Sequence, residues 1–586
     1  MNRDTSSAGI EARPAGSARS SPVVGRILEW LPELILVVAS SVAGIWAGGR
    51  WLDPVGDAGF LWSLAYRLAE GDLLYRDVYL AYSPLSPYLL AGIGHLFRFS
   101  AGWLILSNWI PAIAAGVLLL RCGRPFLTTL ERVATAGVIL AFSLWVAGPG
   151  RLVLPYCPEV VHALVFSLGA LLLMMNSRFS ERTRCWLAGL LGGLAFCAKQ
   201  EIGLAVLIAL LAPFVLRPRG ALSREARILL AFGAVVALGA IFAVSSASFD
   251  VLRERNHLWP FDLIPPAGWN RVLRLAAGIF PVDWAYNLRR DAWELLIQLG
   301  LLACFGLLIA RERKFSYWVP VLVLAVALLC WWIAEDFRFS SRAPVALSAI
   351  VAFLVAALAI AQPAREKREK LLALGTFAGL ASLRAVFSPT VHAHFDGPAH
   401  FATSLTWVVF LCVFAPSILA PARRATEYAR RLTAILLVLG AWNEARGSAE
   451  ALRVPLKEPV ETPRGTVFLN HWDASFYRSL SRELKPGEKV LVLPEINAVD
   501  VIFSVRSVSP LLFHFPGWLD ASFEKELIRR FEANPPDAVV IFNRPLREFG
   551  VARFGEGFGE LLSKWVLRNY EPLVTARSGS LLRRRS

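Results

Sequence analysis

Apolar blocks of bilayer-spanning length alternate with short basic loops along most of this 586-residue chain. A membrane helix needs about 17–25 apolar residues, and the first block, residues 31–49, has this length. Hydrophobic residues make up 56% of the chain and charged residues 18%, whereas soluble proteins average about 45–50% and 25%. These features exclude a disordered chain and a wholly soluble enzyme. They predict a polytopic α-helical membrane protein with a soluble tail.

The basic loops fix a predicted topology, because short loops rich in Lys and Arg stay on the cytoplasmic side. Most of the formal net charge of +16 therefore reports topology, and we expect no nucleic-acid partner. With the N-terminus inside and the C-terminal region outside, the number of crossings is odd, and we count about thirteen. The six basic clusters lie at 121–132, 178–184, 217–227, 311–314, 365–370 and 423–431.

Three regions follow from this topology. Residues 1–25 are predicted to be a disordered cytoplasmic tail, and residues 26–445 a transmembrane domain whose first external loop is 51–85. Residues 446–586 are predicted to form a small extracytoplasmic α/β domain. Its strands are expected at 466–469, 489–494 and 537–542, and its helices at 521–532 and 558–567. We therefore place the protein in the cytoplasmic (inner) membrane, with several passes.

Two stretches strain the count. Residues 84–120 contain a short and a long apolar piece but allow one net crossing, so one piece is expected to be re-entrant or interfacial. Lys199-Gln200-Glu201 separates two short apolar flanks and is expected at the tip of a tight outward hairpin.

The first external loop carries an unusual number of acids. Phe60, Leu64 and Leu68 share one helical face, so we expect an amphipathic helix, of a kind that could lie on the membrane surface. Asp53 or Asp57 could be the N-cap of that helix. This role does not explain a third acid, Asp77, which follows Gly71.

The order of residues in this loop resembles the first external loop of GT-C glycosyltransferases, polytopic enzymes that take a sugar from a polyprenyl-phosphate carrier. The resemblance covers about residues 51–90, the outward hairpin near Lys199, and the general architecture of the membrane region. The matching elements are Asp57-x-Gly59, Ala65, Gly71, Leu74-Tyr75-x-Asp77, Ser83-Pro84-Leu85 and Tyr88.

The resemblance implies an inverting, single-displacement transfer and gives several residues a role. Asp57 aligns with the loop acid and is the candidate base. Asp77 aligns with a second acid that positions substrate or holds the loop, and Tyr75 of the same motif is a candidate substrate contact. Lys199 is the candidate cation for the leaving phosphate, since a lysine at an apolar tip is costly unless it is used; snorkelling to the interface is the alternative.

Further candidates lie in other external loops. Arg384 begins a loop that resembles a family stretch containing an arginine, an acid and a histidine, and His394 is a candidate contact there. Glu159 is the only acid of the second external loop. The chain departs from the family at Ser83-Pro84, where relatives often have Lys-Pro-Pro. We expect no cofactor, although His392, His394, Asp396 and His400 could together bind a metal.

The sequence thus predicts a membrane glycosyltransferase that moves a sugar from a polyprenyl-phosphate donor to a lipid, glycan or protein acceptor outside. A transporter or flippase, and a non-catalytic assembly protein for envelope glycans, are the alternative classes. The motifs select neither the sugar, the acceptor nor the length of the carrier lipid.

Overall fold

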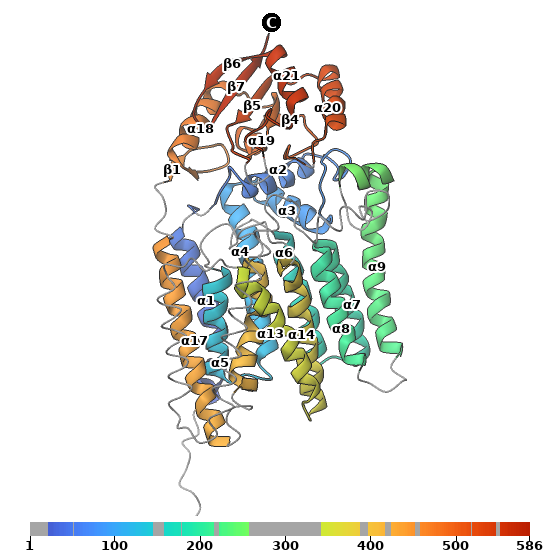
Figure 1. The fold of residues 1–586 in the computed structure, drawn as a ribbon, viewed down its shortest axis with the longest axis vertical. Coiled ribbons are helices and arrows are strands. Elements are labelled where there is room, and N and C mark those ends of the chain that lie inside the picture. The colour runs from blue at the N-terminus through green and yellow to red at the C-terminus, as the bar shows by residue number, and fades with distance from the viewer. Residues whose placement is uncertain are drawn as a thin grey trace, which may run out of the picture.

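The structure is a bundle of long helices with an α/β region at one end, which contains the C-terminus (Figure 1). It is a computed structural model. The residues that it describes are 22–47, 49–50, 52–144, 158–176, 178–215, 222–256, 342–386, 396–415, 423–451, 457–516, 518–546 and 551–585. The expected tail 1–25 thus lies almost entirely outside them.

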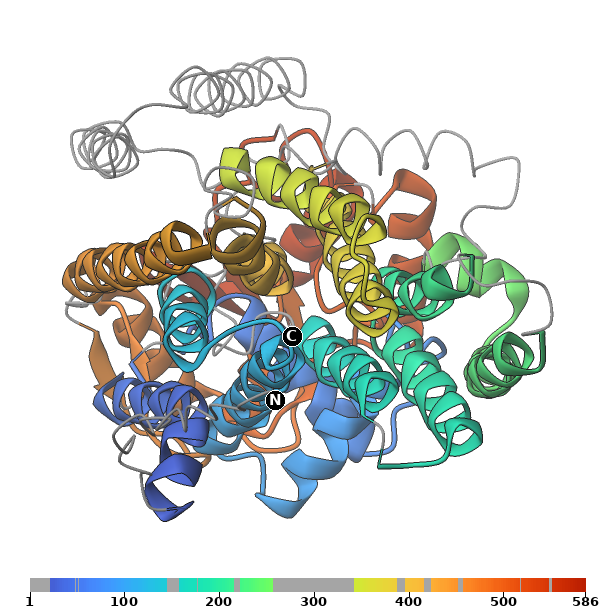
Figure 2. The same ribbon diagram turned by 90° about the horizontal axis from the view of Figure 1, so that it is seen from below.

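The bundle is made of helices whose apolar side chains pack into one core. Seen along the bundle axis, α4 and α6 lie near its middle, and the other helices surround them (Figure 2). The described helices of the bundle are α1 (Pro22–Ala47), α4 (Ala101–Gly123), α5 (Thr129–Ile139), α6 (Pro158–Met175), α7 (Glu181–Ala198), α8 (Gln200–Val215), α9 (Leu222–Ser246), α13 (Arg342–Ile360), α14 (Arg365–Val386), α15 (Asp396–Val409) and α17 (Arg423–Ala451), with π-helical turns η1 (Leu140–Leu144), η2 (Val251–Arg255) and η4 (Phe410–Phe414).

Four helices within the described ranges are long and apolar enough to cross a membrane. They contain the segments Leu28–Ala47, Ala101–Gly123, Pro158–Met175 and Ser223–Ser246, and three shorter apolar helices accompany them. The protein is therefore a helical membrane protein. The total of about thirteen crossings remains a prediction, and the basic cluster at 311–314 lies outside the described residues.

Basic loops that the sequence assigns to one side meet in the structure. Arg430 donates to Glu131 at 2.7 Å, which joins the cluster at 423–431 to the cluster at 121–132. Arg224 pairs with Glu181 at 2.6 Å, which joins the two clusters after α6 and α8. These loops lie at the end of the bundle opposite the α/β region (Figure 1). The relative placement agrees with the positive-inside reading.

The two difficult stretches have clear structures. Residues 84–120 contain α3 (Leu85–Leu96), which at 12 residues is too short to span, and α4, which is long enough. Lys199 is the single residue between α7 and α8, and its extended backbone (φ −148°, ψ 112°) ends the first of these helices. The tight hairpin expected at this position is therefore present.

The α/β region contains a mixed five-stranded sheet. The strand order is β4-β3-β5-β7-β6, with β3 parallel to β4 and β5, and β7 antiparallel to β5 and β6. All five elements expected here are found, as β2, β3, β5, α20 and α21. The elements are β1 (Glu458–Val460), β2 (Val467–Leu469), α18 (His471–Glu483), β3 (Lys489–Leu493), α19 (Val499–Phe503), β4 (Arg506–Ser507), α20 (Ala521–Ala533), β5 (Ala538–Phe542), α21 (Glu560–Asn569), β6 (Tyr570–Thr575) and β7 (Gly579–Arg584).

Alternating side chains of the sheet enter two different cores, as the period of a strand requires. Leu491 and Leu493 face the core formed with α20 and α21. Val490 and Val492 face a second core, which contains Tyr477 of α18 and also buried residues of the first loop. The sheet is therefore buried on both faces, and one of these faces is shared with the membrane part of the chain.

Helix α2 (Asp57–Ala69) of the first loop is the amphipathic helix that the sequence predicts, and its location at the membrane surface remains a prediction. Its polar side is buried as well as its apolar side, because the α/β region covers it. Trp62 donates to the carbonyl oxygen of Phe99 at 3.1 Å, and Phe60 makes an edge-on contact with Phe513. The periodicity identified the helix correctly but not the second surface that covers it.

A buried carboxylate links α2 to the α/β region. The Ser63 hydroxyl donates to Asp500 at 2.5 Å, and the main-chain N–H of Val501 donates to the same oxygen at 2.9 Å. Asp500 is only 1% exposed. Burial raises the pKa of this carboxyl to about 6, although hydrogen bonding from Ser63 and the charge of Arg67 oppose the shift.

The topology predicts that the C-terminus lies outside the cytoplasm. A phosphatase that is active only outside the cytoplasm, fused after residue 586, should be active. The same reporter fused after Ser180, in the basic loop between α6 and α7, should be inactive. Activity in the second fusion alone would reverse the orientation and place the first loop in the cytoplasm.

The raised pKa of Asp500 predicts a stability that depends on pH. The pKa of the Asp500 carboxyl is 3.8 in the unfolded chain and about 6 in the folded protein, so the folded protein holds the proton more tightly. The stability that this gives is fully present below pH 3.8 and is lost as the pH rises through about 6. Asp500→Asn should therefore raise the free energy of unfolding at neutral and alkaline pH by up to roughly 3 kcal/mol. The melting temperature should rise with it.

The difference should shrink as the pH falls toward about 4, where the wild-type carboxyl is protonated in the folded protein. Thermal unfolding of the purified full-length protein across this pH range measures it. Glu532→Gln, an exposed carboxylate of α20, is the matched control. An Asp500→Asn effect that does not vary with pH would contradict the assignment of burial as the cause.

Candidate functional site

Asp57 is the first residue of α2, and the helix N-cap is Gly56. Because Gly56 occupies the N-cap position, neither Asp53 nor Asp57 is the N-cap that the sequence allowed. An acid in the first turn of a helix is favoured by the helix dipole. The side chain of Asp57 lies outside the described residues, and its catalytic role remains a prediction.

Gly59, two residues after Asp57, allows the start of α2 to lie close to Pro54 and to Ala498 of the α/β region. A Cβ atom on Gly59 would lie 2.0 Å from the carbonyl oxygen of Pro54 and 3.0 Å from the main-chain nitrogen of Ala498. Only glycine fits this approach. The Asp57-x-Gly59 pattern therefore has a physical basis: it lets the start of the helix contact the α/β region.

The loop after α2 is held by Tyr75. Its backbone is left-handed (φ 73°) and its side chain is fully buried. The Tyr75 hydroxyl donates to the carbonyl oxygen of Tyr82 at 2.8 Å. Burial raises the pKa of this phenol well above its ordinary value, so it remains a proton donor. Tyr75 thus fixes the end of the loop in place, and its predicted contact with substrate is not tested.

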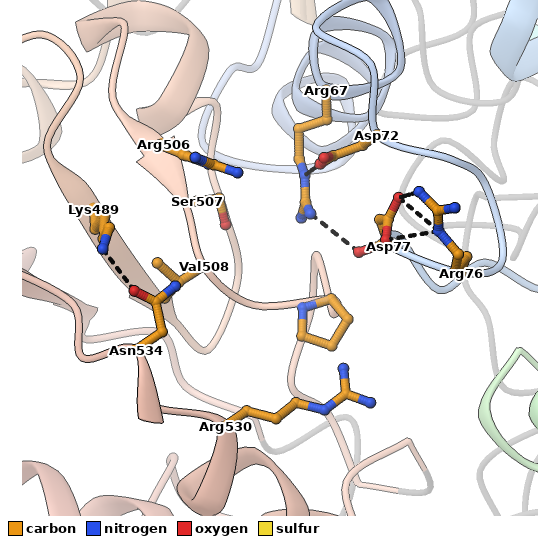
Figure 3. Close-up of a pocket in the computed structure, with 11 residues that line it drawn as sticks. Arg67, Asp72, Arg76, Asp77, Lys489, Arg506, Ser507, Val508, Arg530 and Asn534 are labelled. Carbon is orange, nitrogen blue, oxygen red and sulfur yellow. Dashed lines mark hydrogen bonds and ion pairs between the residues drawn. The ribbon is translucent and has the colours of Figure 1, made fainter. Parts of the chain in front are cut away.

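Asp77 is engaged in holding the same loop. Its carboxylate accepts from the main-chain N–H of Leu73 at 2.9 Å and from Arg76 at 2.8 Å, and its carbonyl oxygen accepts from Arg67 at 3.1 Å (Figure 3). The hydrogen bond from Arg76 is the largest influence and holds the pKa of Asp77 below its usual value. Burial opposes this shift, and the hydrogen bond from Leu73 supports it. These contacts favour the loop-holding role among the two that the sequence left open.

Lys199 and Glu159 come together at the end of the bundle that carries the α/β region. The Lys199 ammonium lies 3.6 Å from Glu159 and 3.8 Å from Glu201, and 4.2 Å from the centre of the Tyr82 ring. The Lys199 and Glu159 side chains are 5% and 4% exposed. We call these four residues the Lys199 cluster. The sequence selected Lys199 and Glu159 separately, and the structure makes them partners.

The hairpin tip also touches the position where this chain departs from the GT-C pattern. The Ser83 hydroxyl donates to the carbonyl oxygen of Phe196, in the last turn of α7, at 3.3 Å. Tyr82, whose ring lies beside the Lys199 ammonium, is the residue before Ser83. Lys199 therefore brings a cation beside the Ser83-Pro84 stretch, which lacks one.

Two polar residues near the Lys199 cluster were not identified from the sequence. His162 lies one turn after Glu159 on α6, and its Nδ1 atom lies 3.1 Å from the Ser86 hydroxyl of α3. Both side chains are buried. The spacing Glu159-x-x-His162 in an apolar helix, which places both on one face, was the available signal.

The remaining candidates cannot be placed. Arg384 lies in the last turn of α14, but its side chain lies outside the described residues, as do His392 and His394. Asp396 begins α15 and His400 follows in it, again without described side chains. Within the described part of the chain, no group of three metal-binding side chains comes together.

Comparisons with known proteins add a likeness in shape. No protein-family model matches the chain, and no curated protein matches its sequence. Among solved structures, ArnT from Cupriavidus metallidurans in the apo state matches with a TM-score of 0.48 and 12% identity, covering 96% of this chain and 98% of that chain. The archaeal oligosaccharyltransferase AglB from Archaeoglobus fulgidus, in complex with an inhibitory peptide and a dolichol-phosphate, matches with a TM-score of 0.45 and 12% identity, covering 88% and 70%.

The arabinofuranosyltransferase AftD from Mycobacteria matches with a TM-score of 0.39 and 12% identity, over 94% of this chain and 40% of that chain. At such low identity, the likeness concerns the arrangement of the chain and not the residues of a site. Each of these likenesses extends over most of this chain, with a TM-score below 0.5.

Proposed function

We propose that the protein is a membrane glycosyltransferase that moves a sugar from a polyprenyl-phosphate carrier to an acceptor hydroxyl. The reaction takes place at the end of the bundle that carries the α/β region, which we place outside the cytoplasmic membrane. The observation that carries the proposal is the buried Lys199–Glu159 pair beneath the first loop, with side chains 5% and 4% exposed.

The burial of Lys199 argues for use rather than snorkelling. A snorkelling lysine extends its ammonium into water, whereas this ammonium is enclosed by two carboxylates and an aromatic ring. A buried charge is costly, and it is retained in membrane proteins mainly where a substrate or ion needs it. A phosphate that leaves the sugar carries developing negative charge, which a preorganised cation in a low-dielectric site stabilises strongly.

The neighbours of Lys199 fit this role. In GT-C relatives a lysine often stands where this chain has Ser83, and here the cation reaches the same stretch from the α7–α8 hairpin. Glu159 and Glu201 hold the ammonium in position before the donor arrives. Glu159 then acts as a positioning residue for Lys199.

Asp57 supplies the second part of the chemistry. An alcohol is a weak nucleophile near neutral pH, and a positioned carboxylate that takes its proton contributes typically 10²–10⁴-fold. In the proposed step the acceptor oxygen attacks the anomeric carbon, the bond to the carrier phosphate breaks, and Asp57 takes the hydroxyl proton. The α/β region, which covers α2, supplies one wall of the space in which an acceptor would bind.

A transporter or flippase is the second candidate, because a buried Lys–Glu pair also occurs where a membrane protein couples ion movement to transport. A panel of radiolabelled polyprenyl-phosphate sugars, incubated with the purified protein and candidate acceptors, separates the two. Transfer of any sugar supports the enzyme. Movement of labelled carrier between leaflets of proteoliposomes, without transfer, supports the transporter.

Lys199→Met is expected to abolish most transfer. Loss of the phosphate-stabilising charge should raise the activation free energy by roughly 2–4 kcal/mol, about 30- to 1,000-fold in rate. The substitution also leaves the buried Glu159 carboxylate without the Lys199 ammonium, which destabilises the fold. Lys199→Met combined with Glu159→Gln removes that second effect, so its melting temperature should recover while its activity does not.

Activity per folded protein is the measurement, and Lys199→Arg, which keeps the charge, should retain more activity than Lys199→Met. The single variant Glu159→Gln should retain more than either form that lacks Lys199. If transfer returns with stability in the double variant, Lys199 is only the structural partner of Glu159.

Asp57→Asn is expected to accumulate normally and to lose nearly all transfer, by about 10²–10⁴-fold. Because Gly56 is the N-cap, the substitution costs only the interaction of one charge with the helix dipole, about 0.3–1 kcal/mol. Asp53→Asn, four residues earlier in an exposed position, is the matched control and should remain active. A fully active Asp57→Asn protein would move the catalytic assignment to Asp77 or Glu159.

A further inference from the structure

A cavity of about 220 Å³ lies between the first loop, strands β3 and β4 and the end of α20, and it shares no lining residue with the Lys199 cluster. Figure 3 shows its side chains converging from both parts of the chain. The lining residues are Arg67, Asp72, Arg76, Asp77, Lys489, Arg506, Ser507, Val508, Pro510, Arg530 and Asn534.

Five basic and two acidic side chains line this cavity. Three of the basic side chains have carboxylate partners. Arg67 pairs with Asp72 at 2.7 Å, Arg76 with Asp77 at 2.8 Å, and Arg530 with Glu526 of its own helix at 2.7 Å. The uncompensated charge is therefore carried by Lys489 and Arg506.

The sheet places these two cations side by side. Lys489 of β3 and Arg506 of β4 are register partners in a parallel pair, so their side chains leave the same face of the sheet. Lys489 donates to the neutral Asn534 side chain at 2.6 Å. The main-chain N–H of Arg506 donates to the carbonyl oxygen of Glu488, but its guanidinium has no hydrogen-bond or ion-pair partner among the residues that the structure describes. Like charges at paired strand positions repel and destabilise a sheet.

An unused hydroxyl adds to the two cations. Ser507, the residue after Arg506, lines the same cavity, and its oxygen is buried without a hydrogen-bond partner within the described ranges. Arg67 forms the buried floor, with a side chain 9% exposed, whereas Arg76 and Arg530 at the rim are 57% and 47% exposed. The cavity thus offers one hydroxyl, two cations without a carboxylate partner, and three further guanidinium groups.

We infer that this cavity binds a phosphate monoester, held between Lys489 and Arg506 of the α/β region and the arginines of the first loop. Guanidinium and ammonium groups are the usual ligands of phosphate, and an anion between Lys489 and Arg506 relieves their repulsion. The volume equals roughly seven waters at about 30 Å³ each, which leaves room for a small group attached to the phosphate. This inference does not depend on the proposed glycosyl transfer.

Binding of inorganic phosphate to the purified full-length protein tests the inference. Phosphate at constant ionic strength, balanced with chloride, should raise the melting temperature in a saturable way. Arg506→Gln and Lys489→Gln should each weaken the apparent affinity about tenfold, since each removes a charge-assisted hydrogen bond. Both side chains lie at the surface of the α/β region, so the variants should fold.

Arg529→Gln is the matched control. It lies next to Arg530 on α20, is exposed, and donates to the carbonyl oxygen of Lys525 in its own helix. It should leave phosphate binding unchanged. Absence of saturable binding, or equal weakening by Arg529→Gln, would overturn the inference and leave a general effect of surface charge.

The source of the phosphate is distinguished by two further ligands. Glycerol 3-phosphate represents a soluble phosphate monoester, and dihexanoyl phosphatidic acid represents a lipid headgroup. Tighter binding of the second ligand, weakened by Arg506→Gln, identifies a lipid or lipid-linked phosphate. Equal binding of both, weakened by the same variant, identifies the phosphate group alone. Binding of either that is insensitive to Arg506→Gln and Lys489→Gln counts against the site.

Discussion

The core that the first loop shares with the α/β region is the constraint on which the rest of the structure depends. Trp62 and Leu64 of α2, Tyr477 of α18 and Val492 of β3 are all buried in this one cluster. A fully buried large apolar side chain contributes about 1.5–3 kcal/mol relative to its exposed state, so the two segments stabilise each other although more than 400 residues separate them. The start of α2, and with it the backbone of Asp57, is fixed by this packing and by the close approach at Gly59.

The parts of the fold that could be predicted are those that local sequence determines. Continuous apolar runs bounded by turn residues identified β3 and β5, and a lysine between two short apolar segments identified the α7–α8 hairpin. The burial of α2 on both of its sides could not be predicted for a complementary reason. Its periodicity identifies a helix with an apolar face, whereas the residues that cover it, such as Asp500 and Phe513, lie far away in the sequence.

The same distinction applies to the candidate site. Lys199 and Glu159 were each conspicuous as charges beside apolar segments, but their pairing depends on how α6 packs against the α7–α8 hairpin, which no local pattern encodes. His162 and Ser86 escaped notice because single polar residues in apolar helices usually satisfy each other or the backbone. The pairing of Lys489 with Arg506 was equally inaccessible, since it requires the register of a parallel ladder whose strands are joined through α19.

One short loop carries groups of both proposed anion-binding regions, the Lys199 cluster and the cavity beside Arg506. The two regions differ in how far their charges are exposed to water. At one end, Asp77 and Arg76 line an open cavity, where mobile ions screen charges over about 8–10 Å. At the other end, Tyr82 lies beside a lysine whose side chain is 5% exposed, so salt screens that charge far less. Tyr75 connects the two ends of the loop. It lies in the turn that the hydrogen bond from the Asp77 N–H to the Leu73 carbonyl oxygen closes, and its hydroxyl donates to the carbonyl oxygen of Tyr82. A cation intended to stabilise charge that develops during a reaction gains most from the buried position, whereas reversible binding of a pre-existing anion is served by the exposed one.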